Sequence, residues 1–184
     1  MANPPPCRFN WQAPSFTLPA TDGATYTLAD ISGANGTLVM FICNHCPDVT
    51  SVITRLIEDA KTIQAMRVGV VAISANDAVT YPEGSFKNMQ RIARLQGFSF
   101  AYLYDQDQTV ARAYDAICTP DFFGFNARGG LQYRGRLDAA GRNPAPPGMR
   151  RDLVEAMQQI AATGRGPQDQ VPSMGCSIKW HAAL

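Results

Sequence analysis

The stretch TLVMFICNHCP, residues 37–47, joins a continuous apolar run to two cysteines and a proline. The run is rich in β-favouring residues and is bounded by Gly36 and Asn44, which predicts a strand buried on both faces of a sheet. Pro47 suits the first turn of a helix, because its missing N–H has no partner to lose there. After it, apolar residues recur at the spacing of one helical face: Val49, Val52, Ile53, Leu56, Ile57, Ala60 and Ile63. The stretch therefore predicts a central strand, a Cys-x-x-Cys turn and an amphipathic helix.

The alternation of strand-like and helix-like segments continues on both sides of this stretch. Strands are predicted at residues 16–18, 25–28, 68–74, 98–104, 122–126 and 131–137, and helices at residues 85–95, 108–115 and 149–162. The first two strands flank the turn Asp22-Gly23 and the last two flank residues 127–130, so each pair is predicted to form a hairpin. Strands joined by helices, together with hairpins, predict an α/β fold with a mixed β-sheet flanked by helices.

Length and charge exclude several classes of function. A chain of 184 residues that is 46% apolar predicts one domain spanning residues 1–184. Its net charge of +1, without a basic run, argues against a nucleic-acid or membrane-surface partner. The longest apolar run, residues 38–43, is far shorter than the ~20 residues that span a bilayer. Because the start MANPPPCRFN also lacks an export signal, we expect a cytoplasmic location.

Five cysteines are too few, and odd in number, for a disulfide scaffold, which leaves redox chemistry, metal binding or packing. Cys43 and Cys46 lie where a strand should meet a helix. We predict that Cys43, near the helix N-terminus, is the attacking thiolate. Cys46, one turn along the helix, would resolve the mixed disulfide. His45 would stabilise the thiolate when protonated, and Asn44 and Pro47 complete the thiolate-tuning motif.

A metal site is the alternative use of the same residues, with Cys43, His45 and Cys46 as ligands. Structural zinc normally needs further ligands at similar spacing. The remaining cysteines and histidine are scattered singly: Cys7, Cys118, Cys176 and His181. The sequence also contains no Gly-rich phosphate loop, no carboxylates at catalytic spacing and no serine nucleophile motif. We therefore expect neither a metal nor an organic cofactor.

Several motifs, taken in order, make the chain resemble the thioredoxin-like superfamily, in its redoxin branch of peroxiredoxins and thiol-specific antioxidant proteins. They are PSFTL at residues 14–18 with the Asp22-Gly23 turn, FICNHCP at 41–47, YD at 104–105, VARAY at 110–114, TP at 119–120 and YRG at 133–135. The resemblance covers residues 13–162, a core that leaves a tail of residues 163–184. It implies a thioredoxin-like fold with an N-terminal hairpin and a helical insertion near residues 76–96.

The resemblance also implies a substrate groove. A cis bond between Thr119 and Pro120 would begin a strand beside the Cys-x-x-Cys pair, and the backbone before the proline would hold an extended peptide or substrate thiol. The chain is similar to bacterial thioredoxin-family proteins that share CNHCP, CTP and the tail GCSIKW, present here at residues 43–47, 118–120 and 175–180. Cys118 is either a packed core residue or an accessory thiol. Cys176 is either a mobile thiol or part of a docked tail.

One departure from the redoxin pattern bears on the chemistry. The peroxiredoxin branch resembles Pro-x-x-x-Thr-x-x-Cys; with Cys46 in the last position, Val39 replaces the proline and Cys43 replaces the threonine. This change produces the Cys-x-x-Cys of a disulfide reductase. We predict a thiol-disulfide oxidoreductase that acts on a protein or small-molecule disulfide and takes electrons from a thiol donor. The alternatives are a thiol peroxidase that reduces hydroperoxides, and a metal-binding or interaction module.

Overall fold

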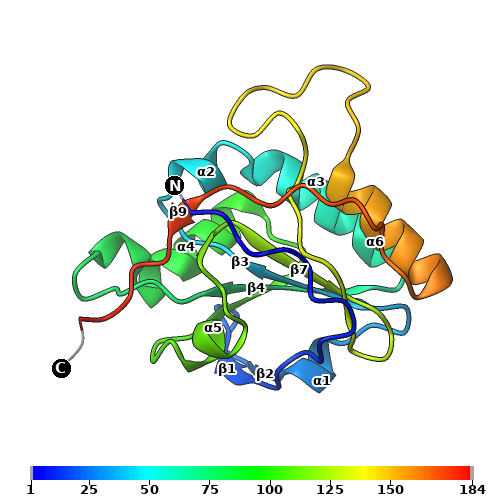
Figure 1. Cartoon of the computed structure of the whole chain (residues 1–184). Coiled ribbons are helices and arrows are strands. Elements are labelled where there is room, and N and C mark those ends of the chain that lie inside the picture. The colour runs from blue at the N-terminus through cyan, green and yellow to red at the C-terminus, as the bar shows by residue number, and fades with distance from the viewer. Residues whose placement is uncertain (1, 183–184) are drawn as a thin grey trace.

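The computed structural model describes residues 2–182 and centres on a five-stranded mixed sheet. The strand order is β5-β4-β3-β7-β8, with the bounds Ala101–Tyr104, Gly69–Ser74, Thr37–Phe41, Asp121–Phe125 and Leu131–Tyr133. The pairs β3–β4 and β4–β5 are parallel, whereas β3–β7 and β7–β8 are antiparallel. The predicted mixed sheet is confirmed, and β3, which leads into the cysteines, is its middle strand (Figure 1).

The middle strand β3 is apolar because both of its faces are buried. Successive side chains of a strand point to opposite faces. Leu38 and Met40 accordingly enter one hydrophobic core, and Val39 and Phe41 enter the other. The sheet is thus covered on both sides. The turn that contains the cysteines follows β3, a strand held in place by packing on both of its faces.

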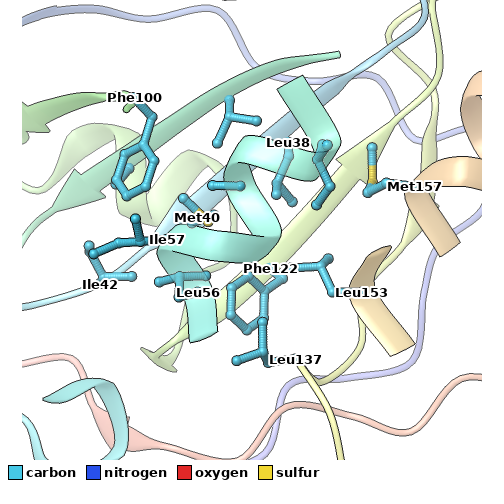
Figure 2. Packing of buried hydrophobic residues seen from close by; sticks show 14 of the residues in the cluster. Leu38, Met40, Ile42, Leu56, Ile57, Phe100, Phe122, Leu137, Leu153 and Met157 are labelled. Carbon is cyan, nitrogen blue, oxygen red and sulfur yellow. The ribbon is translucent and has the colours of Figure 1, made fainter. Parts of the chain in front are cut away.

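Three helices cover the first face: α3 (Ile53–Ala65), α4 (Phe86–Gln96) and α6 (Asp152–Thr163). Figure 2 shows Leu56 and Ile57 of α3 among side chains of the strands, with Leu153 of α6 beside Phe122 of β7. Fully burying such a side chain contributes roughly 1.5–3 kcal/mol. Along the chain, the short helix η1 (Pro82–Gly84) and α4 come between β4 and β5, and they form the predicted helical insertion.

The second face packs against the N-terminal hairpin and a short helix (Figure 1). β1 (Thr17–Pro19) and β2 (Thr25–Thr27) pair antiparallel, and α5 (Thr109–Ala113) lies beside them. The hairpin turn uses Gly23 at φ +88°, a left-handed conformation that glycine adopts without a steric penalty. Ile178, from the C-terminal tail, is buried in the same core.

The long helix predicted after Pro47 is divided in two. α2 spans Pro47–Thr50, and α3 begins at Ile53 after the turn residues Ser51 and Val52. The Ser51 hydroxyl donates to the Pro47 carbonyl, a local bond that competes with the regular helical ladder. The apolar stripe is kept because both pieces face the same core.

Several predicted strands are shorter than their sequence pattern indicated, and local side-chain bonds account for two of them. The strand expected at residues 25–28 ends at Thr27, which caps α1 (Leu28–Ile31) in a reciprocal pair of hydrogen bonds with Asp30. The strand expected at residues 131–137 ends at Tyr133, whose hydroxyl donates to the Arg136 carbonyl at 2.6 Å and whose ring lies against Gly135. Local side-chain bonds turn the chain at both places.

The sequence analysis did not predict a further two-stranded sheet that joins the tail to the segment before Pro120. β6 (Cys118–Thr119) pairs antiparallel with β9 (Cys176–Ser177) of the tail. In Figure 1 this tail, drawn in red, lies beside α2 and the N-terminal segment. Among residues 2–182, no helix has both the length and the apolar character needed to cross a bilayer.

Candidate active site

Cys43 and Cys46 lie in the turn between β3 and α2. The backbone N–H groups of Val49 and Thr50 both donate to the Cys46 carbonyl at 2.9 Å, and Cys46 is the N-cap of α2. The prediction that Cys46 lies one turn along the helix is therefore wrong, whereas Cys43 does lie near the helix N-terminus, in the turn just before it. The helix begins at Pro47, as expected for a proline, because its fixed φ suits the first helical position.

The bond between Thr119 and Pro120 is cis, and it lies against both cysteines. The Cys43 Sγ atom is 3.3 Å from the Thr119 hydroxyl oxygen, and the Cys46 Sγ atom is 3.4 Å from the Thr119 carbonyl oxygen. Both cysteines are buried, each with 3% of its surface exposed. The structure thus brings together the four residues that the motif and the family resemblance placed near one another.

The two thiols differ in acidity. The pKa of Cys46 is lowered to about 5, first because its sulfur shares a hydrogen bond with Cys43, and further by contacts with Cys176 and Thr119. The pKa of Cys43 is raised, first by the same shared hydrogen bond and then by burial. These directions favour a thiolate on Cys46 and a proton on Cys43, whereas the sequence pattern predicted Cys43 as the thiolate.

Three further residues complete the site. Asp48, in the first turn of α2, is buried and accepts two hydrogen bonds from the guanidinium of Arg142, at 2.5 and 2.9 Å. This pairing is the main reason that the pKa of Asp48 is lowered. The Cys176 thiol donates a hydrogen bond to Asp48 Oδ2 at 3.0 Å. The Cys46 Sγ atom is 3.8 Å from the same oxygen.

Sequence reasoning named Cys176 only as an accessory thiol and missed the other two residues. The signal for Asp48 was present, because an acidic residue directly after Cys46-Pro47 must lie in the first turn of the helix. Arg142 gave no signal. It belongs to the Pro- and Gly-rich loop of residues 141–148, and only the folded chain brings that loop to α2.

Asn44 was predicted to tune the thiolate, but its amide is used elsewhere. Its Nδ2 group donates to the Glu83 carbonyl at 2.9 Å, and its Oδ1 accepts a hydrogen bond from the Tyr102 hydroxyl at 2.9 Å. These bonds tie the cysteine turn to η1 and β5. Asn44 therefore fixes the turn rather than contacting either sulfur.

His45 and Cys118 have different surroundings from the thiol pair. The Nδ1 atom of His45 is buried and has no hydrogen-bond partner among residues 2–182. Cys118 is fully buried, its thiol donates to the Pro120 carbonyl at 3.5 Å, and burial raises its pKa. Of the two uses considered for Cys118, its surroundings favour packing.

Two cavities flank the cysteines. A cavity of about 90 Å³ is lined by Cys43, Asn44, Phe98 and Tyr102, among other residues. Another of about 140 Å³ lies on the other side, with Asp48, Pro120 and Arg142 in its wall. Both are small and partly apolar, which suits the side chains next to a disulfide better than a large organic cofactor.

A metal site would use a different set of residues from the predicted one. Cys46, Asp48 and Cys176 each offer a ligand atom, and these atoms lie within 4.8 Å of one another. His45 is not in this group. Both carboxylate oxygens of Asp48 are engaged by Arg142, so an ion would have to displace a guanidinium. This set fits a metal poorly, although its thiols suit redox chemistry.

Comparisons with known proteins agree with this fold. An uncharacterised conserved protein from Geobacillus kaustophilus is 40% identical, with a TM-score of 0.93 over 100% of this chain and 97% of that one. A hypothetical protein from Sinorhizobium meliloti 1021 is 34% identical, with a TM-score of 0.91 over 100% of both chains. A secreted Mycobacterium tuberculosis disulfide oxidoreductase shares the fold at 19% identity, with a TM-score of 0.57 over 80% of this chain and 95% of that one.

No curated protein sequence matches the chain significantly. The model of the AhpC/TSA family matches residues 10–134, a range that includes the strand β3, both cysteines of the turn and the cis proline. The fold is thioredoxin-like, as the likeness to the Mycobacterium tuberculosis disulfide oxidoreductase shows. This protein is therefore a thioredoxin-like oxidoreductase that belongs to the AhpC/TSA family.

Proposed function

We propose that the protein is a thiol-disulfide oxidoreductase whose redox centre is the pair Cys43 and Cys46. The observation that carries the proposal is geometric: two buried thiols both lie against Thr119, whose bond to Pro120 is cis, and the pKa of Cys46 is lowered there. A thiolate is the form of cysteine that attacks disulfides.

The reaction has two exchange steps. The Cys46 thiolate attacks one sulfur of a substrate disulfide, forms a mixed disulfide and releases the other substrate sulfur as a thiolate. The Cys43 thiol then attacks Cys46 Sγ, closes the Cys43–Cys46 disulfide and releases the second substrate sulfur, which takes up the Cys43 proton. Two electrons pass from the protein to the substrate, and a thiol donor restores the dithiol. The substrate is a protein or small-molecule disulfide.

Thr119 supports both steps. Its hydroxyl is within hydrogen-bond distance of Cys43, and its carbonyl lies beside Cys46. The hydroxyl can donate to the sulfur of Cys43 as that residue loses its proton. The cis bond to Pro120 holds the carbonyl in this position, so the residue aligns the two sulfurs with each other.

Replacing each cysteine separately tests the proposal and the order of attack. We expect Cys46→Ser to abolish reaction with dithiobis-nitrobenzoate and with insulin disulfides. Cys43→Ser should still carry out the first attack but lose the Cys43–Cys46 disulfide. Cys7→Ser, which removes a half-buried thiol from the N-terminal segment, is the matched control and should retain wild-type rates. Full turnover in Cys46→Ser would refute the assignment.

A thiol peroxidase is the second candidate, and the family match favours it. In that reaction the Cys46 thiolate attacks a hydroperoxide, releases an alcohol or water and becomes a sulfenic acid, which Cys43 then condenses to a disulfide with loss of water. Stopped-flow measurement with hydrogen peroxide separates the candidates. Oxidation of Cys46 no faster than that of a free thiol would exclude peroxidase function.

A further inference from the structure

The tail of the protein pairs with β6, the short strand before Pro120 where an extended substrate is predicted to bind. Thr119 of β6 is paired with Cys176 of β9, and Cys118 with Ser177. Extended peptides bind by adding a strand to the edge of such a strand. In this structure the chain's own tail has taken the place predicted for a substrate, and it carries a thiol into the site.

Specific contacts hold the tail there. The N–H of Ile178 donates to the Ile117 carbonyl at 3.1 Å, and the Ser173 hydroxyl donates to the Pro120 carbonyl at 2.8 Å. Gly175 approaches so closely that a Cβ atom on it would lie 2.2 Å from the Thr119 carbonyl oxygen. These contacts fit the tail to this edge, residue by residue, and explain the sequence pattern at residues 173–178.

The next residue of the tail reaches the redox centre. The Sγ atoms of Cys176 and Cys46 lie within 4.8 Å of each other. We propose that Cys176 is a second resolving thiol, which forms a disulfide with Cys46 when β9 pairs with β6 again after the mixed disulfide has formed. The inference rests on the proposed function, because it needs Cys46 to form a mixed disulfide first.

The exchange balances without a further reagent. After the Cys46 thiolate has attacked a substrate disulfide, the Cys176 thiol attacks Cys46 Sγ. The Cys46–Cys176 bond forms, the bond to the substrate breaks, and the proton of Cys176 goes to the departing substrate thiolate. Asp48 is a positioning residue: its carboxylate accepts the Cys176 S–H hydrogen bond and directs the thiol toward this site.

The pKa of Cys176 depends on its neighbours in the site. Its pKa is raised to about 12, by burial first and then by the neighbouring Cys46 and Asp48. Once Cys46 is part of a mixed disulfide, it no longer carries a negative charge, so one cause of that rise is removed. The loss of that charge lowers the pKa of Cys176 and so favours its attack on the mixed disulfide.

The test counts the thiols released when the protein reacts with dithiobis-nitrobenzoate, in a Cys7→Ser background that removes an unrelated thiol. The Cys43→Ser variant should release about two equivalents of thionitrobenzoate, because attack by Cys46 is followed by closure onto Cys176. Peptide mass mapping without reduction should find Cys46 joined to Cys176. Cys43→Ser with Cys176→Ser should release about one equivalent and keep a stable adduct on Cys46.

A stable adduct on Cys46 in the Cys43→Ser variant, with Cys176 free to be alkylated, would overturn the inference. Other results would contradict the proposed function itself: Cys46 of the wild type would not react, or no Cys43–Cys46 disulfide would form. Gly175→Ala keeps every cysteine and guards against a folding defect in the serine variants. It should lower the share of Cys46–Cys176 relative to Cys43–Cys46, and an unchanged ratio would contradict the role of the docked strand.

Discussion

Shortening Ile178 should expose the redox centre without removing any residue from it. Ile178 follows Cys176 by two residues and is 3% exposed in the core on the second face of the sheet. Truncating such a side chain to alanine costs about 2–3 kcal/mol at a site near a chain end. If the tail opens while the rest of the molecule stays folded, the truncation lowers the free energy of tail opening by this full amount, because Ile178 makes no core contacts in the open state.

This cost sets the size of the expected effect. Each 1.4 kcal/mol changes an equilibrium tenfold, so the open tail should become roughly 30 to 140 times more populated in Ile178→Ala. Cys46 is buried and contacts Cys176, so reagents reach it mainly from the open state. The rate of Cys46 alkylation by iodoacetamide should rise by the same factor, measured by quenching and peptide mass spectrometry. Urea unfolding of the same variant gives the global loss.

Leu18→Ala is the matched control. Leu18 belongs to the same core and is 7% exposed, but it lies in β1 rather than in the tail. Its truncation should reduce global stability by a similar amount and leave Cys46 alkylation nearly unchanged. Equal acceleration in both variants, or none in Ile178→Ala despite a loss of stability, would refute the view that the tail covers Cys46 as a separate unit.

Three other expectations concern the same site. As pH falls, the rate of Cys46 alkylation in the wild type should stay constant and then drop near pH 5, because the pKa of Cys46 is lowered to about 5. The free energy of unfolding should rise from pH 5 to pH 9, since the unfolded chain keeps the proton that folded Cys46 has lost. Arg142→Gln should move the drop to higher pH, because the Asp48 carboxylate beside Cys46 loses its partner, and no movement would contradict the pairing. Gly175→Ala should speed Cys46 alkylation several-fold, whereas Gly84→Ala, whose Cβ would meet nothing closer than 3.9 Å, should not.

Patterns that depend on near neighbours in the chain predicted the fold well. The apolar run before the cysteines became the middle strand, and the stripe after Pro47 became the helical face on the first core. Both follow from burial and periodicity, which are local properties. The break at Ser51 and Val52 was missed because it depends on a side chain that bonds its own backbone while the apolar pattern continues unbroken.

The site was predicted less completely, because its parts come from distant segments. Arg142 reaches Asp48 across 94 positions of the chain, and Cys176 reaches Asp48 across 128. Nothing in the local composition of residues 141–148 marks an arginine that would neutralise a carboxylate beside a thiolate. The GCSIKW motif of the tail was visible in the sequence. Its role depends on the pairing of β9 with β6, and the local sequence of β6 does not indicate which segment pairs with it.

The order of attack shows how one structural fact changes a chemical assignment. Cys-x-x-Cys spacing places two thiols together but does not say where the helix begins. In this chain the helix begins at Pro47, so Cys46 caps it and Cys43 lies four residues before it, beside the Thr119 hydroxyl. The directions of the two pKa values therefore favour Cys46, rather than Cys43, as the attacking thiol that we propose. Because the tail strand brings Cys176 within 4.8 Å of Cys46 Sγ, this proposed nucleophile has a second thiol besides Cys43 near enough to resolve its mixed disulfide.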